Sequence, residues 1–424
     1  MVDELKYVII VGDGMADYPI EGLKGKTPLM SAKTPHMDWM ARHGEVGLVR
    51  TIPKGFSPGS EIANLSIFGY DPAHYYTGRG PLEAASMGIQ LQPSDIAFRC
   101  NLVTLQGQGE KTIMDDFSAG HITNDEAERI IFDLNQEIGT EEIRFYPGVS
   151  YRHLMVSKNG AGKFSNLEKL ELTPPHDILD KEISPFLPKV GKPIKSPGPK
   201  EGGEEQILAL MKRSQRLLKN HPVNIAREEK GLKPANSIWL WGQGKSPHMT
   251  TLKERFGIEG YVISAVHLLK GIGTYAGLEV LEVPGATGYF DTNYDGKAQY
   301  ALRGLKNKNL VYLHIEAPDE AGHMGDLRLK IEAIEVFDER VVGSILKGMK
   351  DFKSYRVMVL PDHPTSLSLR THTADPVPFV IYSSEEGAEN GQVKSFDEDS
   401  ARQSGVFIEK GFELIERFLG FRSA

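Results

Sequence analysis

PDHPTSLSLRTHT, residues Pro361–Thr373, places Asp362 beside His363 and adds His372 after a short loop. The run directly before it, Arg356–Leu360, is short, apolar and rich in β-branched residues, and a proline follows it. These features predict a buried strand. In open α/β sheets the functional crevice lies outside the carboxyl ends of the strands. The pattern therefore predicts three metal ligands at the end of one strand.

Two more apolar runs end in the same way. Val311–Ile315 is followed by Asp319 and His323, and Tyr7–Val11 is followed by Asp13. The carboxyl ends of parallel strands meet at one edge of a sheet, where a crevice can form. Carboxylates and imidazoles together are a ligand set for divalent transition metals. We therefore expect the three strand ends to converge on one metal site.

Length and composition limit the classes of protein that fit. A chain of 424 residues exceeds the size of one ordinary hydrophobic core, so two domains are expected. The net charge of −8 argues against a nucleic-acid surface. The start of the chain has no signal pattern, and no apolar run approaches the roughly 18 residues of a membrane span. Cys100 is the only cysteine, so no intrachain disulfide can form, and a soluble cytoplasmic protein is expected.

Short apolar strands alternate with amphipathic helices, which predicts an α/β fold with a mainly parallel sheet covered on both faces. Gly44–Pro53 is a further strand candidate. His36 and Asp38 could be metal ligands, but we interpret their segment as the first turn of a helix, with Thr34 as N-cap and Pro35 in the first turn. No strand end presents these two side chains to a metal.

Ser60 stands at a predicted helix start, because a Pro-Gly turn precedes it and SEIANLSIFG has helical spacing. Two roles are open for it. Ser60 could be a simple N-cap with Glu61 in the first turn. It could also be a nucleophile, since the dipole and the free N–H groups of a helix N-terminus favour an alkoxide and the phosphate that it attacks. The predicted metal ligands favour the nucleophile.

The middle of the chain is predicted to form an inserted domain. Residues 81–233 carry no ligand motif but continue with strand and helix patterns, including the helix Asn124–Ile138 with a capping signal at Asn124. The metal-binding domain would then be discontinuous, formed by residues 1–80 and 234–424. Lys189–Gln206 is rich in Lys, Pro and Gly, which predicts a mobile surface loop with solvated charges.

Two other features need an interpretation. Gly242–Ser246 follows a strand-like run, but Trp239 stands where a P-loop requires glycine, so the segment is interpreted as the return to the metal-binding domain. Asp338 interrupts the apolar stripe of a predicted helix over Asp326–Phe352. A buried carboxylate needs hydrogen bonds. Asp338 is either a partner of a ligand histidine or a structural acceptor, and the sequence leaves both open.

The ordered set of motifs resembles a known family. VGDG at Asp13, PGSEIANLSIFGYDP at Ser60, DEAGH, PDH and THTADPVPF are similar to motifs of the archaeal-type cofactor-independent phosphoglycerate mutases, within the alkaline phosphatase superfamily. The similarity runs nearly end to end, through YYTGRGPLEAA, AFRCN, DFSAGHI, TPPHD and HPVNIAREEKGLKPANSIWLWGQG. It implies an alkaline-phosphatase-like α/β sandwich with a mainly parallel sheet and an inserted smaller α/β (α+β) domain.

The resemblance also implies a ligand set for two divalent cations. One cation would be held by Asp319, His323 and His372, and the other by Asp13, Asp362, His363 and the oxygen of Ser60. Mixed carboxylate and imidazole ligands fit Mn²⁺ or Zn²⁺, and also Co²⁺, better than Ca²⁺, and the histidines disfavour Mg²⁺. No bisphosphoglycerate is expected as a cofactor.

The implied reaction is the interconversion of 3-phosphoglycerate and 2-phosphoglycerate through a phosphoserine at Ser60. A second domain that closes over the site is expected, because water must be kept from the phosphoserine. Three alternatives remain. PTSLSLRTHTADPVPF is close to the motif of a proposed homoserine kinase group in the same family, a phosphatase could use the same metals, and a non-catalytic binding protein could keep the fold. The oligomeric state is left open.

The substrate is a small anion, so its anchors should be cationic or polar, and arginine binds carboxylate and phosphate as a planar fork. The alternative for any single arginine is a surface ion pair. The resemblance leads us to expect arginine in the AGHI block, where this chain has His121. The candidate anchors are His121, Arg152, His153, Asn224 and Arg227, with Arg99 and Asn101 as further candidates.

Overall fold

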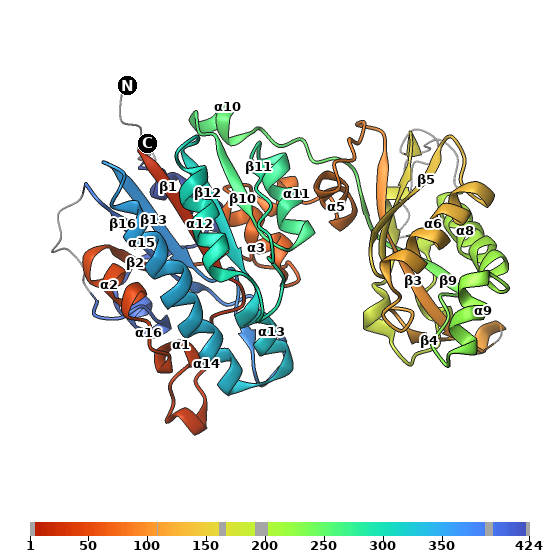
Figure 1. The fold of residues 1–424 in the computed structure, drawn as a ribbon, viewed down its shortest axis with the longest axis horizontal. Helices are drawn as coiled ribbons and strands as arrows, with labels where there is room; N and C mark the ends of the chain where they lie inside the picture. The colour runs from red at the N-terminus through yellow and green to blue at the C-terminus, as the bar shows by residue number, and fades with distance from the viewer. Residues whose placement is uncertain (1–4, 108, 161–166, 191–201, 386–392, 421–424) are drawn as a thin grey trace. The chain divides into compact units, whose positions relative to one another are not determined.

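Two units make up the fold of the computed structural model, which describes residues 5–107, 109–160, 167–190, 202–385 and 393–420 (Figure 1). Unit 1 comprises residues 1–76 and 248–424, and unit 2 comprises residues 77–247. Most of the predicted loop over Lys189–Gln206, from residue 191 to residue 201, lies outside the described residues.

An eight-stranded sheet forms the centre of unit 1. Its order is β11 (Glu279–Val280), β10 (Gly260–Ile263), β12 (Leu310–Ile315), β1 (Lys6–Gly12), β13 (Tyr355–Leu360), β16 (Val377–Ser383), β2 (Glu45–Val49) and β17 (Phe407–Ile408). The pairs are parallel except where β16 runs antiparallel to β13 and to β2. The predicted α/β class with a mainly parallel sheet is therefore confirmed.

The three apolar runs that precede the predicted ligands are the central strands β12, β1 and β13. Their register aligns Gly12 with Ile315 and Val11 with Leu360. All three strands therefore end at the same level of one sheet edge. Side chains that follow these strands are brought together by the sheet itself.

Helices cover both faces of this sheet (Figure 1). Because successive strand residues point to opposite faces, Val8 and Ile10 pack into the larger hydrophobic core while Tyr7 contacts Phe418 on the other face. The core face carries α2 (Pro35–His43), α12 (Tyr294–Gly304), α14 (Leu327–Val336), the π-helix η6 (Phe337–Val342) and α15 (Gly343–Met349). The other face carries α3 (Ser60–Ile67), α11 (His267–Tyr275) and α17 (Leu414–Leu419).

The predicted helix over Asp326–Phe352 contains a π-helical turn, and Asp338 lies in that turn, fully buried. Its Oδ1 accepts a hydrogen bond from the Met37 N–H at 2.7 Å, and its Oδ2 accepts one from the His36 N–H at 3.1 Å. These are first-turn groups of α2, where the Thr34 side chain makes no capping bond. Asp338 is therefore a structural acceptor for α2. Burial raises its pKa to about 6.

Unit 2 is built on an antiparallel sheet with helices, which corresponds to the α+β form of the predicted inserted domain. Its strands are β3 (Ile96–Gln106), β4 (Ile113–Asp116), β5 (Ile143–Val149), β6 (Arg152–Ser157) and β9 (Ser237–Gly244). Its helices include α6 (Asn124–Glu137) and α8 (Gly203–Leu218), which are the longer ones, and the shorter α9 (Pro222–Glu229). The N-cap of α6 is Thr123, whose side chain accepts from the Glu126 N–H, and not the predicted Asn124.

The predicted division is displaced at both boundaries. Residues 77–80 lie in unit 2, whereas the prediction placed them in the metal-binding domain. Strand β9 pairs with β3 from Ser237 opposite Val103 to Gly244 opposite Ala97. Residues 234–247 therefore lie in unit 2, whereas the sequence pattern placed them in the metal-binding domain. The reason is that β9 is a strand of the unit 2 sheet through its pairing with β3, and the local sequence does not reveal this pairing.

The remaining elements are short. In unit 1 they are η1 (Glu21–Leu23), α1 (Pro28–Ser31), α4 (Pro72–Tyr75), α10 (Leu252–Phe256), α13 (Ala317–Met324), β14 (Thr365–Ser366), β15 (Thr371–His372), α16 (Glu398–Gln403) and η7 (Gly411–Glu413). In unit 2 they are α5 (Arg79–Ser86), η2 (Gly109–Lys111), η3 (Leu167–Lys169), β7 (Leu170–Glu171), η4 (Pro175–Ile178), η5 (Ser184–Phe186) and β8 (Lys189–Val190).

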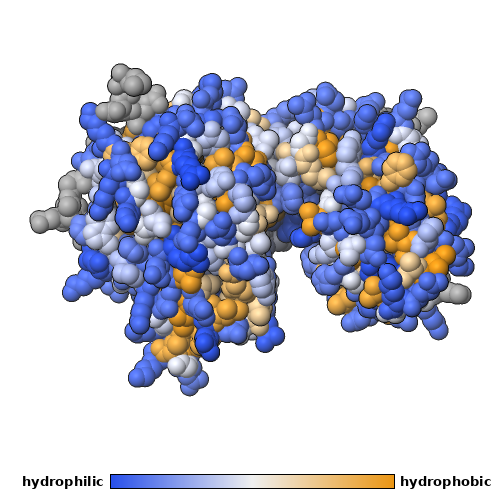
Figure 2. All heavy atoms as spheres, viewed as in Figure 1, coloured by the Kyte–Doolittle hydropathy of each residue, from blue (hydrophilic) through white to orange (hydrophobic). Residues whose placement is uncertain are grey.

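The protein surface is mostly polar, as is usual for a folded protein. Hydrophilic residues predominate on the face shown in Figure 2, and apolar residues form small groups there. Among the described residues, no helix combines the length and the apolar character that crossing a bilayer requires.

The role of Asp338 can be tested by the substitution Asp338→Ala. This change leaves the His36 and Met37 N–H groups without their acceptor, so we expect the free energy of unfolding to fall by about 1–3 kcal/mol. Urea denaturation of metal-free protein measures it. Glu339→Ala, at the exposed neighbouring position, is the control and should change stability by no more than about 0.5 kcal/mol. Equal effects of both variants would contradict the capping role.

Candidate metal centre

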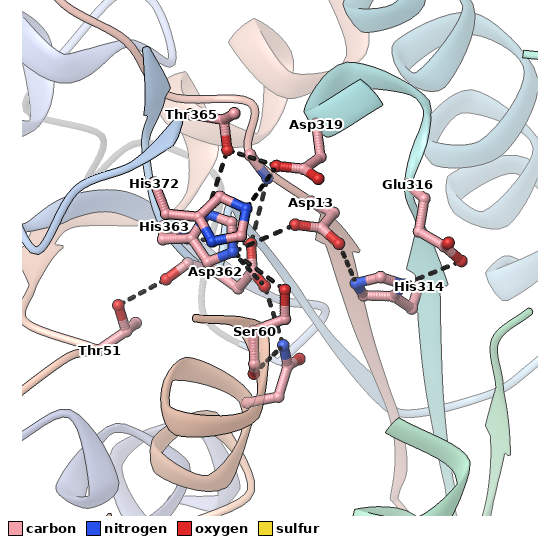
Figure 3. A network of polar contacts seen from close by, with 12 residues as sticks. Asp13, Thr51, Ser60, His314, Glu316, Asp319, Asp362, His363, Thr365 and His372 are labelled. Carbon is pink, nitrogen blue, oxygen red and sulfur yellow. Dashed lines mark hydrogen bonds and ion pairs between the residues drawn. The ribbon is translucent and has the colours of Figure 1, made fainter. Parts of the chain in front are cut away.

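The candidate site lies at the carboxyl ends of the three central strands (Figure 3). Asp13 follows β1, Asp319 lies in the first turn of α13 after β12, and Asp362 and His363 follow β13. His372 reaches the same place by a different route, because β15 pairs with β14 and so folds back over the strand end. Three segments far apart in the chain thus supply these side chains, and the last of them supplies ligands before and after its loop.

One group of side chains surrounds the carboxylate of Asp319. The Nε2 atom of His323 lies 3.2 Å from Asp319 Oδ2, and the Nε2 atom of His372 lies 3.3 Å from Asp319 Oδ1. The two Nε2 atoms are only 2.9 Å apart. His323 donates its Nδ1 proton to the Arg370 carbonyl at 3.1 Å, which turns its other nitrogen toward the group. All four polar atoms point at one small volume.

A second group surrounds the Nε2 atom of His363. This atom lies 3.4 Å from Asp362 Oδ2, 3.5 Å from Asp13 Oδ1 and 3.1 Å from Ser60 Oγ. Ligand atoms of Asp13, Asp362 and His363 lie within 4.8 Å of one another, and so do those of Asp319, His363 and His372. The family resemblance assigned His363 to one cation only, whereas here its side chain stands between both groups.

Metal ions fit this arrangement on two observations. The Oδ1 atom of Asp13 is buried, and no described residue forms a hydrogen bond with it. Two imidazole nitrogens face each other at 2.9 Å beside a carboxylate, which is a geometry that a shared cation explains. Carboxylate and imidazole donors are the ligands of divalent transition metals. These side chains could therefore hold two divalent cations.

Without metal, the site brings buried carboxylates close together, and a bound cation would offset their repulsion. Burial and the neighbouring carboxylates of Asp362 and Asp319 raise the pKa of Asp13 well above its usual value. Burial also lowers the pKa of His363, which keeps its imidazole neutral and able to bind a cation. Although burial acts to raise the pKa of Asp319, hydrogen bonds from His323 and His372 hold it well below its usual range.

Ser60 is the first residue of α3, and the preceding Gly59 is the N-cap. The simpler role considered for Ser60, a helix N-cap, is thus taken by another residue. Its Oγ lies beside His363 instead, at the 3.1 Å given above. The first-turn N–H groups of α3 and the metal ligands therefore flank the same hydroxyl.

Asn64 and Tyr312 support Ser60, and the sequence reasoning missed both. The Asn64 Nδ2 donates to the Ser60 carbonyl at 2.8 Å and to Asp362 Oδ2 at 2.9 Å. Its Oδ1 accepts from the hydroxyl of Tyr312, which lies fully buried in β12. A signal was present, because Asn64 follows Ser60 by one helical turn and so shares its face.

His314 supports Asp13 and was also missed. Its Nε2 lies 3.1 Å from Asp13 Oδ2, which leaves Oδ1 as the oxygen directed at His363. His314 is the only charged or ionisable residue besides Tyr312 in β12, and it is fully buried. A polar residue inside an apolar strand run was the available signal.

Gly14 in the first motif is required by close packing. Its φ is +60°, and a Cβ there would lie 2.4 Å from Thr365 Oγ1 and 2.6 Å from Asp319 Oδ1. Any side chain at this position would displace a ligand group. The glycine therefore allows β1 and the β13 loop to approach.

In unit 2, several cationic side chains gather around aromatic rings. The Arg99 guanidinium lies 4.3 Å from the Trp241 ring, and that of Arg79 lies 5.7 Å from it. The His176 ring is 5.4 Å from the same Trp241 ring. Glu83 forms an ion pair with Arg99 at 2.9 Å. The surplus of positive charge makes this cluster suited to a small anion.

Two predicted anchors lie close to one ring of the same unit. The guanidinium of Arg152 stands 5.4 Å from the Tyr151 ring, and the ring of His121 lies 6.3 Å from it. Both side chains are exposed. Asn101, a further candidate, accepts a hydrogen bond from the Trp241 indole at 3.0 Å, so it orients that ring.

Three other predicted anchors are occupied or enclosed by the protein. Arg227 is buried and bonds to Glu126 at 2.6 Å, to the Ala119 carbonyl and to the Lys233 carbonyl. Asn224 is buried and holds the Leu218 and Ala235 carbonyls. The geometry favours structural roles for both, because their donors already have partners.

His153 is enclosed as well. It is 2% exposed, and its Nδ1 accepts from the Gly148 N–H at 3.0 Å. Burial lowers its pKa to about 3, so it stays neutral and is a poor anchor for an anion.

Comparisons with known proteins agree across the chain. Residues 41–224 match the family described as 2,3-bisphosphoglycerate-independent phosphoglycerate mutase. A probable 2,3-bisphosphoglycerate-independent phosphoglycerate mutase from Geobacter sulfurreducens is 53% identical over 415 residues, which cover 98% of this chain and 100% of the relative.

Two solved structures share the fold. The PH0037 protein from Pyrococcus horikoshii has 28% sequence identity and a TM-score of 0.80, and the match covers 100% of this chain and 99% of that one. The cofactor-independent phosphoglycerate mutase from Thermoplasma acidophilum has 27% identity and a TM-score of 0.65, over 99% of this chain and 100% of that one.

The pair of His323 and Asp319 predicts a pH dependence in the metal-free protein. Asp319 raises the pKa of His323 to about 9, above the value of about 6.5 in an unfolded chain. The stabilisation from this pair is then complete below about pH 6.5 and is lost as the pH rises through about 9. We expect His323→Gln to lower the free energy of unfolding more at about pH 6 than at about pH 10, by denaturation after chelation.

A matched control is His248→Gln, which changes an exposed histidine of the same unit and should show no such difference. If His323→Gln has the same effect at both pH values, the proposed proton-linked pair is wrong.

Proposed function

Because this chain belongs to the family of 2,3-bisphosphoglycerate-independent phosphoglycerate mutases, its activity is the interconversion of 3-phosphoglycerate and 2-phosphoglycerate, and we propose that the phosphate passes through Ser60. The observation that carries this proposal is the position of the Ser60 hydroxyl. It stands at the start of α3 and beside the ligand groups, where a phosphate would be met by cations and by the positive end of the helix dipole.

The reaction would proceed in two transfers. In the first, Ser60 Oγ forms a bond to phosphorus, the bond to the 3-oxygen breaks, and the serine proton ends on that oxygen. Phosphoserine and glycerate result. In the second, the 2-hydroxyl of glycerate forms the new bond to phosphorus, and the serine oxygen takes back a proton. The sum is an isomerisation without a co-substrate, which is why no bisphosphoglycerate is needed.

Ser60 must be held in place for an in-line attack. Asn64 fixes the Ser60 carbonyl and Asp362 together, and the Tyr312 hydroxyl fixes Asn64. Because both supports are buried, water does not compete for these hydrogen bonds. The nucleophile is thus preorganised before substrate arrives.

We assign Asp319, His323 and His372 to one divalent cation, and Asp13, Asp362, His363 and the Ser60 oxygen to the other. When bound, such cations neutralise the charge of the phosphoryl group and lower the pKa of the serine hydroxyl. The donor set supports Mn²⁺ or Zn²⁺, with Co²⁺ as a further choice.

We assign the binding of the substrate's anionic groups to unit 2. Arg152 and His121 are exposed there, and Arg99 adds charge near Trp241. Arginine binds a carboxylate or phosphate with two parallel hydrogen bonds, so these side chains are suited to the anionic groups of phosphoglycerate. The proposed setting is the cytoplasm, in glycolysis and gluconeogenesis.

The nucleophile is tested by Ser60→Ala. We expect conversion of 3-phosphoglycerate to 2-phosphoglycerate to fall by at least about 1,000-fold, while bound metal persists, because the substitution removes the acceptor of the phosphate. The assay contains neither ATP nor bisphosphoglycerate and is repeated with Mn²⁺, Zn²⁺ and Co²⁺. Ser66→Ala, a buried serine later on the same helix, is the control and should keep its activity.

Two outcomes would contradict the proposed chemistry. Retention of mutase activity by Ser60→Ala would exclude Ser60 as the nucleophile. ATP-dependent phosphorylation of homoserine by the wild-type protein, with no isomerisation of phosphoglycerate, would exclude the mutase reaction.

The substrate anchor is tested by Arg152→Ala. Loss of a charged hydrogen bond to the substrate should raise KM by about 10- to 100-fold and leave the metal content unchanged. Arg129→Ala removes an exposed arginine on α6 and serves as the matched control. An unchanged KM for Arg152→Ala would remove this residue from the substrate site.

A further inference from the structure

Thr365 contacts both ligand groups of the metal centre, and Figure 3 shows its side chain beside Asp319 and His372. Its Oγ1 donates a hydrogen bond to Asp319 Oδ1 and lies 3.3 Å from the Nδ1 atom of His363. The side chain is fully buried. A single hydroxyl therefore contacts a ligand of each group.

The direction of these hydrogen bonds follows from the number of protons. A carboxylate can only accept, so the one hydroxyl proton of Thr365 is used by Asp319. The contact with His363 then requires that Nδ1 carries a proton and donates it to Thr365 Oγ1. In a neutral imidazole this places the lone pair on Nε2, the nitrogen that faces Asp13, Asp362 and Ser60.

The main chain holds Thr365 in this position. The buried ammonium of Lys330 donates to the Thr365 carbonyl at 2.5 Å and to Asp17 Oδ2 at 2.8 Å. The Thr365 N–H donates to the Ala16 carbonyl at 3.2 Å. These bonds join the loop after β1 to the loop after β13. The main chain of Thr365 therefore cannot move away from the ligands without breaking these bonds.

We propose that Thr365 is a positioning residue of the mutase, whose hydroxyl couples the two ligand groups by orienting Asp319 and by fixing the tautomer of His363. This inference rests on the metal-dependent function proposed above. Removal of the hydroxyl would take away one of the contacts that orient the Asp319 carboxylate and the contact that selects the tautomer of the His363 imidazole. Both groups would then bind their cations less tightly.

The test compares Thr365→Val with Thr365→Ser. Valine has the shape of threonine without the hydroxyl, and serine keeps the hydroxyl. Protein freed of metal with a chelator is titrated with Co²⁺, and calorimetry gives stoichiometry and affinity while the visible absorption of bound Co²⁺ reports its coordination. We expect Thr365→Val to weaken Co²⁺ binding by about 10- to 100-fold and to change the absorption spectrum, and Thr365→Ser to retain both.

The matched control is Thr104→Val in unit 2. This change likewise removes a buried threonine hydroxyl, which in Thr104 donates to the Pro234 carbonyl at 2.8 Å. It should leave Co²⁺ binding unchanged. Thr365 packs closely against Gly322, so thermal unfolding of the metal-free variants checks that they are folded. If the valine variant does not fold, Thr365→Ala replaces it in the comparison with serine.

Wild-type affinity and spectrum in the folded valine or alanine variant would overturn the inference. A serine variant as weak as the valine variant would overturn it too, because the hydroxyl would then not be the cause. Binding is measured without substrate, so a wild-type protein that binds Co²⁺ but does not isomerise phosphoglycerate contradicts the proposed function and leaves this comparison intact. A wild-type protein that binds no Co²⁺ overturns the metal centre and the inference together.

Discussion

Convergence of negative charge at the edge of the central sheet is the constraint on which the structure depends. Asp13, Asp319 and Asp362 are buried at the ends of three adjacent strands, and burial together with repulsion from the other two carboxylates raises the pKa of Asp13. Such a cluster is costly unless cations compensate it. The parallel register of β12, β1 and β13 creates the cluster, so the fold and the need for metal have one origin.

Three further side chains hold the buried carboxylates in place. His314, Asn64 and Thr365 each bind an oxygen of one of the three carboxylates, and each is buried. A carboxylate with one oxygen held presents the other in a fixed direction, which is the preorganisation that metal binding and phosphoryl transfer both require. In unit 2 the Arg99 and Arg152 side chains supply cationic groups, which fits the anion-binding role proposed for them.

Sequence patterns were informative where neighbouring residues act together. An apolar run followed by an acid predicted the three central strands and their polar ends, because strand, turn and ligand are adjacent in the chain. Patterns failed where a partner is distant. Arg227 and Asn224 lie in a motif-like block, yet their side chains bond to carbonyls from other segments. Strand β9 was placed in the wrong unit for the same reason, since only its pairing with β3 decides where it belongs.

The sequence by itself determined the α/β class, the family and the residue types from which a metal centre could be built, because these depend on local periodicity and on short ordered motifs. Only the tertiary structure decided that Asp338 caps α2, that Gly59 is the N-cap before Ser60, and that Thr365 stands between two groups of ligands. The physical reason is that hydrogen bonds depend on distance and direction in space, which the order of residues does not give. His36 and Asp338, for example, are 302 residues apart in the chain and are hydrogen-bonded in the fold.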